Sequence, residues 1–493
     1  MKIRFKWRSI IVWGGFLALP WISAGGSDSG TRISHIAPAG EDALASPKVI
    51  LGRPTDRSVT ANVLSDSAVV AFLEYGGGAG LYSLRTADVA IQAGQPVEIE
   101  MAGLRPNAVS YYRLRYRLPA ESVFSAGEES SFWTQRAPGS TFVFGIQADS
   151  HPERTKSMFD PALYAIALGN VAADRPDFYL ALGDDFSVDT LKTVNAATVA
   201  QVYLNQRAFL ERVGRSAPLF LVNGNHEQGA AYLLDGTPNN LAVYVQTARN
   251  RLFPQPFPGG FYTGDETPVD HIGLLGDYYA WTWGDALFVV IDPYWHSPVA
   301  VDNDASGEEK NRDLWAITLG EDQYRWLETT LERSQARFKF VFAHHVNGTG
   351  RGGVEGTGDY EWGGKNGKGT WEFDAKRPGW ELPIHQLMAK NGVTVFFQGH
   401  DHLFVKQSLD GVIYQECPIP ADYTYSAFNE DAYLTGIKFP NAGHLRVTVS
   451  EADVKVEYIR AFLPGDETGG HRNGELAYSY SAAGKSKGGG IRR

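Results

Sequence analysis

The sequence predicts a protein of two folded parts, an all-β sandwich followed by an α/β (α+β) domain. The chain has 493 residues, more than one ordinary compact core holds, so two or three domains are expected. Between Pro47 and Thr134, short segments alternate apolar and polar residues without a helical pattern. From Ser140 onward, short apolar segments alternate with helical ones, which is typical of an α/β domain.

The composition is that of a globular protein, with 43% hydrophobic and 20% charged residues. The net charge of -11 argues against nucleic acid as a bulk partner, because such partners usually need a basic surface. Small phosphorylated substrates are compatible with this charge, since bound metal ions supply local positive charge. Cys417 is the only cysteine, so an internal disulfide cannot form and a buried, unreactive thiol is expected.

Residues 1–25 have the pattern of a cleaved signal peptide. Basic residues come first, at Lys2, Arg4, Lys6 and Arg8. The apolar run from Ile10 to Ile22 is shorter than the ~20 residues that a membrane span needs. We therefore favour an export signal over a membrane anchor, and expect no stable membrane span once it is removed. Residues 26–45, rich in Gly, Ser and Ala, are expected to form a linker. This pattern predicts a periplasmic or extracellular protein.

Residues 46–137 are expected to form the sandwich. Val59, Ala61 and Val63 alternate with polar residues, and the glycines at 76–78 end an apolar strand. The segment from 104 to 114, with Leu-Arg-Pro-Asn followed by Tyr-Tyr-Arg-Leu, resembles the corner and following strand of a fibronectin type III domain. We therefore expect a fibronectin III-like sandwich in front of the second domain.

Residues 138–462 are expected to form the catalytic domain. Apolar strands are expected at Phe142–Ile146, Phe178–Leu182, Leu219–Val222, Leu287–Ile291, Lys339–Phe342 and Val393–Phe397. Helical stretches are expected at Pro161–Ala173 and Gln323–Arg333. Residues 463–493 are polar and end in two arginines, so we expect a flexible C-terminal tail.

Five of these strands are followed by side chains that bind metal ions. The segments are Asp149-Ser150-His151, Gly183-Asp184-Asp185, Gly224-Asn225-His226-Glu227, His344-His345 and Gly399-His400-Asp401-His402. Parallel strands present their carboxyl ends at one edge of a sheet, so these side chains should converge. Carboxylates and imidazoles without thiolate suit Zn, Mn and Fe.

The ligand set is large enough for two metal ions, each with an open position. Its members are Asp149, His151, Asp184, Asn225, His344, His400 and His402. Two cations ~3.5–4 Å apart need a bridging ligand, which an aspartate provides. A hydroxide shared by the two is nucleophilic near neutral pH, and both cations neutralise charge on phosphoryl oxygens.

The order DxH, GD, GNHE, a histidine after an apolar strand, and GHxH resembles the signature of the calcineurin-like metallophosphoesterases. With the sandwich in front, the chain looks most like the purple acid phosphatase branch. The resemblance implies two packed mixed sheets flanked by helices. It implies that Asp149, His151 and His402 hold the first metal. It also implies that Asn225, His344 and His400 hold the second, with Asp184 as the bridge.

The same resemblance assigns further roles. His226 is expected over the substrate, donating to the phosphate or the leaving group, while Glu227 orients its loop. Asp185 and Glu227 are the candidate carboxylates beside His226. Apart from the resemblance, His345 is a candidate substrate contact or loop hydrogen-bonder, and Arg351 is a candidate substrate contact. For Arg154, Trp295, His296 and Trp371 an ordinary loop or surface role is the simpler interpretation.

The chain departs from the purple branch at two positions. Ser187 stands where that branch has a tyrosine ligand, and His151 is present where the branch lacks a histidine. The resemblance therefore implies a protein without violet colour, and leaves the metals open among Fe, Zn and Mn.

The predicted function is hydrolysis of a small phosphate ester by two metal ions, foremost as a phosphomonoesterase of the acid phosphatase kind. One alternative is a phosphodiesterase that acts on nucleotides or lipid head groups. A non-catalytic binding protein of the cell surface is a third interpretation, against which the complete ligand set argues. Natural substrate and oligomeric state are left open by the sequence.

Overall fold

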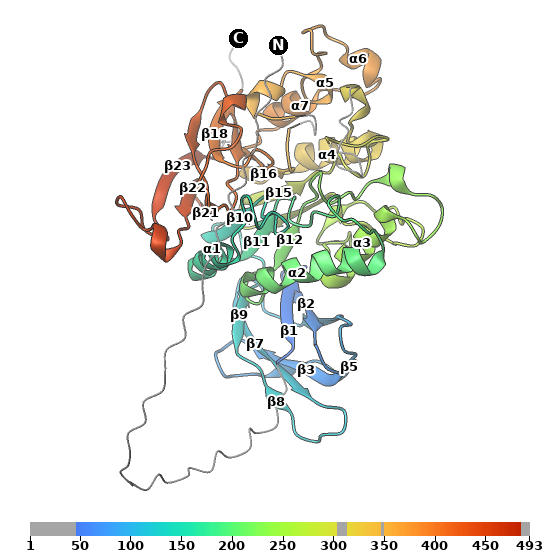
Figure 1. The fold of residues 1–493 in the computed structure, drawn as a ribbon, viewed down its shortest axis with the longest axis vertical. Coiled ribbons are helices and arrows are strands. Elements are labelled where there is room, and N and C mark those ends of the chain that lie inside the picture. The colour runs from blue at the N-terminus through green and yellow to red at the C-terminus, as the bar shows by residue number, and fades with distance from the viewer. Residues whose placement is uncertain (1–45, 303–312, 347–349, 485–493) are drawn as a thin grey trace, which may run out of the picture. The chain divides into compact units, whose positions relative to one another are not determined.

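The computed structural model describes residues 46–302, 313–346 and 350–484. The predicted signal peptide (1–25) and linker (26–45) lie outside the described residues. Figure 1 shows the order of helices and strands along the chain. In the described part of the chain, no helix is both long and apolar enough to cross a membrane.

The N-terminal part is built from two antiparallel sheets. The first contains β1 (Lys48–Gly52), β2 (Ser58–Leu64) and β6 (Val97–Ala102). The second contains β3 (Val69–Gly76), β4 (Leu84–Arg85), β5 (Val89–Ile91), β7 (Val109–Arg117), β8 (Ser125–Ala126) and β9 (Ser130–Trp133). Along β7, Tyr112, Leu114 and Tyr116 are buried while the residues between them are half-exposed. An all-β region therefore lies where the alternating pattern predicts it, and its fibronectin III-like type stays a prediction.

The second part contains two larger sheets. One has the order β12-β11-β10-β21-β22-β23, with β10 (Phe142–Gln147), β11 (Phe178–Ala181), β12 (Leu219–Leu221), β21 (Gly443–Val449), β22 (Asp453–Arg460) and β23 (Leu476–Ala483). Within it, β10, β11 and β12 are parallel, and β21 joins β10 antiparallel. This confirms the expected mixed sheet.

The other sheet has the order β13-β14-β15-β16-β17-β19-β18-β20. Its strands are β13 (Thr263–Gly264), β14 (Tyr279–Trp283), β15 (Ala286–Val290), β16 (Phe338–Phe342), β17 (Val395–Gln398), β18 (Phe404–Leu409), β19 (Val412–Glu416) and β20 (Ile437–Phe439). The strands β15, β16, β17 and β19 are parallel to their neighbours in that series. The carboxyl ends of β15, β16 and β17 therefore lie at one edge.

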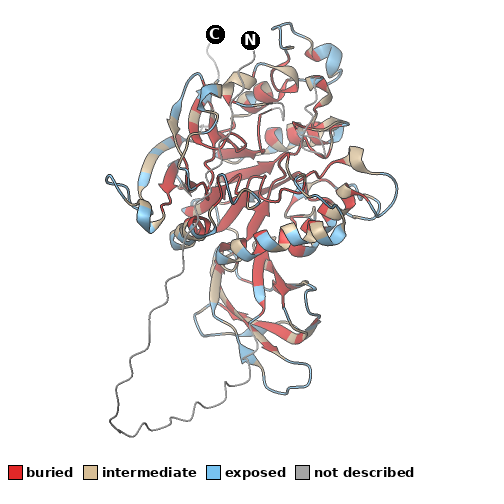
Figure 2. Cartoon of the chain, in the orientation of Figure 1, coloured by how far each residue is buried: buried red, intermediate tan, exposed pale blue. Residues whose placement is uncertain are grey.

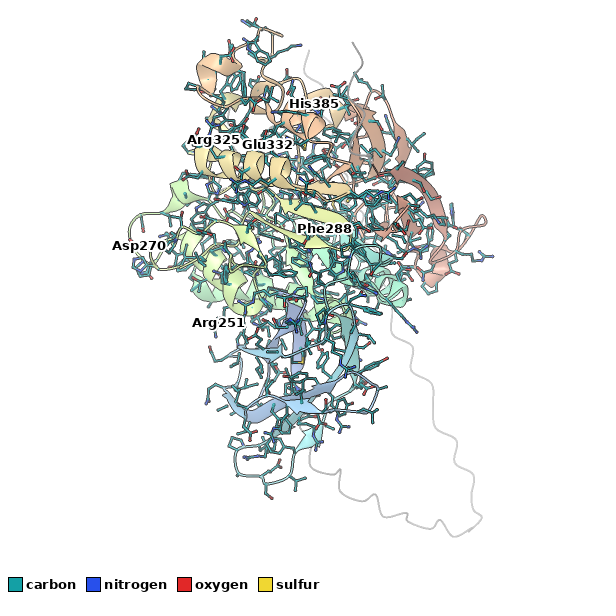
Figure 3. The ribbon with its side chains drawn as sticks, turned by 180° about the vertical axis from the view of Figure 1, so that it is seen from behind. Arg251, Asp270, Phe288, Arg325, Glu332 and His385 are labelled. Atoms are coloured by element: carbon teal, nitrogen blue, oxygen red, sulfur yellow. The ribbon has the colours of Figure 1, made fainter. Side chains whose placement is uncertain are left out.

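Aromatic side chains fill the core that both sheets share. The Phe220 and Trp281 rings, one from each sheet, stack with their centroids 4.1 Å apart. Phe288 contacts Phe144 across the same core at 5.2 Å. Figure 2 shows the central strands as buried, and Figure 3 labels Phe288 near the middle of the molecule. Burial on this scale, without a disulfide, stabilises the fold mainly through the hydrophobic effect.

Helices cover the outer faces of the two sheets. The sheet that contains β10 is covered by α1 (Pro161–Asp174), α2 (Ala196–Gly214) and α3 (Leu241–Leu252). The other is covered by α4 (Gly320–Arg333), α5 (Tyr360–Gly363), α6 (Phe373–Lys376) and α7 (Ile384–Lys390). Short 3-10 helices are η1 (Ala231–Leu233), η2 (Leu314–Ala316), η3 (Val354–Gly356), η4 (Glu430–Ala432) and η5 (Pro464–Asp466). Helix α1 begins where Asp160 accepts hydrogen bonds from the backbone of Ala162 and Leu163.

The expected C-terminal tail differs from the structure. Within residues 463–493, β23 pairs antiparallel with β22 over most of its length. β23 is an edge strand whose inward side chains Tyr478, Tyr480 and Ala482 pack against the core, while Ser479 and Ser481 are exposed. This alternation is short and lies among polar residues, so the composition of the region does not reveal it.

Candidate metal centre

Five loops deliver the predicted ligands to one place. Asp149 and His151 follow β10, Asp184 follows β11, and Asn225 follows β12. From the other sheet, His344 follows β16, while His400 and His402 follow β17. All seven side chains are buried. The Asp and His side chains of this set therefore lie close together at the strand ends, as the sequence predicts.

Asp149, His151 and His402 make one group. The distance from Asp149 Oδ1 to His402 Nε2 is 3.3 Å. His151 Nε2 lies 3.8 Å from Asp149 Oδ1 and 3.8 Å from Asp184 Oδ2. The other oxygen of Asp149 accepts a hydrogen bond from the His400 backbone at 2.8 Å. The carboxylate is thus held so that Oδ1 faces the two imidazoles.

Asp184 lies between this group and the other side of the site. Its Oδ2 is 3.0 Å from His344 Nε2 and 3.8 Å from His226 Nε2. The His344 ring lies next to the His400 ring, with centroids 5.3 Å apart. A carboxylate that approaches histidines from both groups has the position that a bridging ligand needs.

The site contains buried polar atoms without hydrogen-bond partners. They are Asp149 Oδ1, His151 Nε2, Asn225 Oδ1, His344 Nε2 and His400 Nε2. Each such atom costs free energy unless something binds it. Oxygen and imidazole nitrogen donors without thiolate suit Zn, Mn and Fe. The residues present therefore fit a pair of cations.

The histidines are oriented from behind. His344 Nδ1 lies 2.9 Å from the Leu182 carbonyl oxygen, to which it can donate. His151 Nδ1 lies 2.9 Å from Glu153 Oε1. A proton held on Nδ1 leaves the Nε2 lone pair available for a metal. Burial lowers the pKa of His344, but Asp184 and Asp149 outweigh it and raise that pKa to about 10. The two carboxylates thus attract positive charge to this position.

The ligand loops adopt unusual backbone conformations. Positive φ angles occur at Asp149 (58°), His151 (45°), Asp184 (56°), His400 (81°) and His402 (63°). Residues other than glycine rarely adopt this left-handed backbone conformation, and such backbone strain clusters at functional sites. Glycines allow the loops to approach: a Cβ on Gly399 would lie 2.5 Å from Asp149 Oδ2.

Glu227 joins two of the ligand loops. Its Oε2 accepts hydrogen bonds from the backbone N–H of Asp184 at 3.0 Å and of Gly224 at 2.7 Å. Its Oε1 accepts from Asp185 and Phe186, both at 2.9 Å. Both oxygens of this carboxylate bind backbone donors, four in all, so the side chain orients the loops and does not face the metal positions.

The sequence pattern described as Calcineurin-like phosphoesterase matches residues 142–404. The chain belongs to the calcineurin-like phosphoesterase family. It is accordingly a metal-dependent hydrolase of phosphate esters. The family predicted from the order of the motifs is confirmed at this level, while the purple acid phosphatase branch stays a prediction. A comparison with curated protein sequences finds no match.

Solved structures show the fold. The structure described as "Structure of PhoD" has a TM-score of 0.57 at 15% identity, covering 84% of this chain and 86% of that one. GAP50, "the anchor in the inner membrane complex of Plasmodium", has a TM-score of 0.38 at 12% identity, with 70% and 90% covered. A putative 5'-nucleotidase from Staphylococcus aureus has 0.34 at 13%, with 71% and 55% covered. The last two scores are too low to carry an argument.

In this phosphoesterase, His226 is held by a carboxylate that the sequence does not reveal. Its Nδ1 lies 2.7 Å from Asp189 Oδ2, whereas Asp185 and Glu227 make their contacts elsewhere. The prediction that Asp185 or Glu227 is the carboxylate beside His226 was thus wrong. His226 Nε2 lies 3.2 Å from Arg154 Nη2, so Arg154 belongs to the site despite its simpler surface interpretation. The 37 and 72 residues that separate these partners explain why no local pattern predicts them.

The two candidate substrate contacts both touch the His400 loop. His345 stacks on the His400 ring with centroids 4.1 Å apart, and its Nδ1 lies 2.6 Å from the Tyr294 hydroxyl. Arg351 Nη1 donates to the His400 carbonyl oxygen at 2.6 Å. Asp302, which the sequence did not single out, has Oδ2 3.6 Å from His400 Nε2. These contacts support the ligand loop, and a direct role toward substrate stays a prediction.

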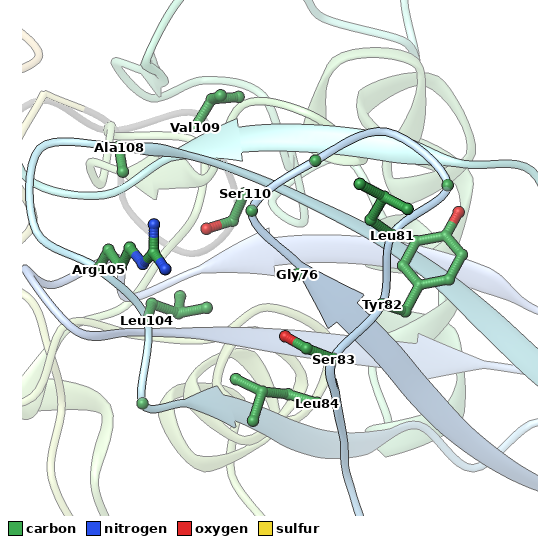
Figure 4. A pocket seen from close by; sticks show the side chains of 14 residues that line it. Gly76, Leu81, Tyr82, Ser83, Leu84, Leu104, Arg105, Ala108, Val109 and Ser110 are labelled. Atoms are coloured by element: carbon green, nitrogen blue, oxygen red, sulfur yellow. The ribbon is translucent and has the colours of Figure 1, made fainter.

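The hollow drawn in Figure 4 lies on the N-terminal sandwich, away from these ligands. Its volume is about 610 Å³, and its walls are the segments 76–84 and 103–110. Among the described residues that line it, none is acidic and none is a histidine. It therefore lacks the groups that metal-dependent hydrolysis requires.

Proposed function

We propose that this chain is a binuclear-metal phosphomonoesterase. Asp149, His151 and His402 hold one metal, Asn225, His344 and His400 hold the other, and Asp184 bridges them. The observation that carries this proposal is the set of buried, unpartnered ligand atoms that converge from five strand ends. When bound, the cations supply an activated water and neutralise charge on the phosphoryl oxygens.

The chain's own residues supply binding and proton transfer. Arg154, a quarter exposed, reaches toward His226 with a guanidinium that suits phosphate oxygens. Asp189 fixes the His226 ring so that Nε2 faces the same space. In this arrangement Arg154 binds the phosphate, and His226 donates the proton that the leaving oxygen needs.

A monoester fits these groups better than a diester does. Arg154 adds one cationic donor beside the metal positions, and Asp184 and Asp189 favour a second, the protonated ring of His226. A terminal phosphate carries more negative charge and more free oxygens than a diester, so it gains more from them. One observation favours the diester alternative: the exposed Phe428 ring has its centroid 6.3 Å from that of His402 and offers an apolar face for a nucleobase or lipid head group.

The test compares kcat/KM for p-nitrophenyl phosphate and bis(p-nitrophenyl) phosphate on the full chain loaded with Zn, Mn or Fe. We expect the monoester to be preferred, and Arg154→Ala to lower its kcat/KM roughly 10- to 100-fold, the worth of one charged hydrogen bond. The exposed Arg212→Ala on α2 is the matched control. A higher value for the diester with every metal would contradict the monoesterase proposal.

We also infer export to the periplasm or the cell exterior. The inference rests on the basic and apolar order of residues 1–25 and on the short apolar run within them. The expected substrate is a small phosphorylated molecule, which the family and the acidic net charge both favour over bulk nucleic acid.

A further inference from the structure

A second group of metal-binding side chains lies outside the seven ligands. Asp265, Asp277 and His296 each place one ligand atom within 4.8 Å of the others. His296 Nε2 is 2.8 Å from Asp277 Oδ2. Asp265 follows β13, Asp277 precedes β14, and His296 lies in the loop after β15. Antiparallel pairing of β13 and β14 brings the two aspartates together, with Asp265 N donating to the Tyr278 carbonyl oxygen at 3.3 Å.

The group contains a buried carboxylate oxygen without a partner. Asp277 is fully buried, and its Oδ1 makes no hydrogen bond. Asp265 is 5% exposed and uses one oxygen to accept a hydrogen bond from Thr267 N. In the described ranges, neither aspartate makes an ion pair with a lysine or arginine. Two buried carboxylates facing one imidazole leave negative charge that is costly without a cation.

We propose that Asp265, Asp277 and His296 bind a third divalent cation, Zn²⁺ or Mn²⁺. Two carboxylate oxygens and one imidazole nitrogen suit these ions, and three protein ligands leave a fourth position for water. Calcium fits less well because it prefers a shell made of oxygen alone. The His296 side chain is 20% exposed, which gives the ion a route from solvent.

The position of this site gives it a structural task. The chain leaves the sheet after Asp265 and returns at Asp277, and Figure 3 labels Asp270 at the periphery of this excursion. A cation clamps both ends of the excursion to the loop that carries His296. The neighbouring Trp295 carbonyl oxygen accepts a hydrogen bond from Ala231 N at 3.1 Å, five residues after His226. The clamp therefore restrains a segment that borders the catalytic loop.

The experiment counts metal per full-length chain by mass spectrometry after loading with Zn²⁺ or Mn²⁺ and desalting. Asp277→Asn keeps the shape of the side chain and should contain one equivalent less than wild type. Asp270→Asn, an exposed acid in the same excursion, should match wild type. The rise in melting temperature on adding Zn²⁺ should also shrink in Asp277→Asn, because ligand binding stabilises the folded state.

Equal metal content in wild type and folded Asp277→Asn would overturn the proposal and leave a plain ion pair with His296. If Asp277→Asn does not fold, His296→Gln replaces it with the same expectation. Calorimetric titration of Zn²⁺ into Asp184→Asn, whose metal pair is disrupted, provides an independent count. One remaining equivalent supports the third site, and none refutes it. Turnover is not measured, so failure of the phosphatase proposal would not affect this result.

Discussion

In the proposed mechanism, His226 is the side chain that donates the proton to the leaving group. Burial and the charge of Arg154 lower its pKa, but Asp184 and Asp189 outweigh them and raise the pKa to about 9. Bound cations would offset the Asp184 charge and bring the pKa down again. A histidine held between these effects can be protonated at neutral pH, as donation to a leaving oxygen requires.

The pH dependence of kcat should report this group. The protonated form is present at low pH and is lost as pH rises through its pKa, so activity should fall on the alkaline side, at or below about pH 9. Asp189→Asn should move this fall to lower pH, because it removes a carboxylate that favours the charged ring. His226→Asn should abolish the fall and reduce kcat about 10²- to 10⁴-fold.

These profiles are measured with an alkyl phosphate and with metal content checked in each variant. An unchanged alkaline limb in His226→Asn would show that another group supplies the proton. Only part of the surroundings of His226 could be predicted from the sequence. His226 follows from the GNHE motif, whereas Asp189 and Arg154 reach it only through the folding of separate loops.

At the scale of the element, short buried strands end in ligand loops that brace each other. The strands were predictable because runs such as Phe142–Gln147 and Phe338–Phe342 are apolar and bounded by polar turns. Many other elements were not predicted. Among them are helix α2, which packs on the sheet that contains β10, and the edge strand β23, whose Tyr478, Tyr480 and Ala482 pack against the core. In both elements, tertiary contacts determine a secondary structure that the local sequence pattern does not specify.

Replacing Glu227 by Gln tests the bracing. One oxygen becomes an NH₂ group that faces backbone N–H donors, so two buried hydrogen bonds are lost. We expect unfolding of the metal-free protein to need about 3 kcal/mol less, from the usual cost of unsatisfied buried groups. Urea unfolding measures this, and metal content should fall as the Asp184 loop loosens.

The exposed Glu332→Gln on α4, labelled in Figure 3, provides the control and should behave as wild type. If Glu227→Gln were as stable and as well loaded as this control, the four backbone contacts would contribute nothing to the ligand loops.

At the scale of the whole molecule, two sheets packed face to face bring five loops from 149 to 402 together. The order of the motifs predicts this centre, because each of the five motifs follows its own apolar strand. Asp265, Asp277 and His296 were not predicted as a group. The loop sequences around them carry no motif, and the two aspartates come together only through the pairing of β13 with β14. The sandwich is joined to this body by buried contacts, such as Arg207 Nη2 donating to the Asn62 carbonyl oxygen at 2.9 Å.

Metal content and phosphate ester turnover in Asp184→Asn together test whether Asp184 bridges a catalytic metal pair. Asp184 contacts histidines of both groups, so its loss should release the metals of the pair and reduce turnover more than about 10³-fold, as expected when electrostatic stabilisation is removed. The fold should persist, as circular dichroism would show. An Asp184→Asn protein that keeps its full metal content and wild-type turnover would show that Asp184 does not bridge a catalytic metal pair.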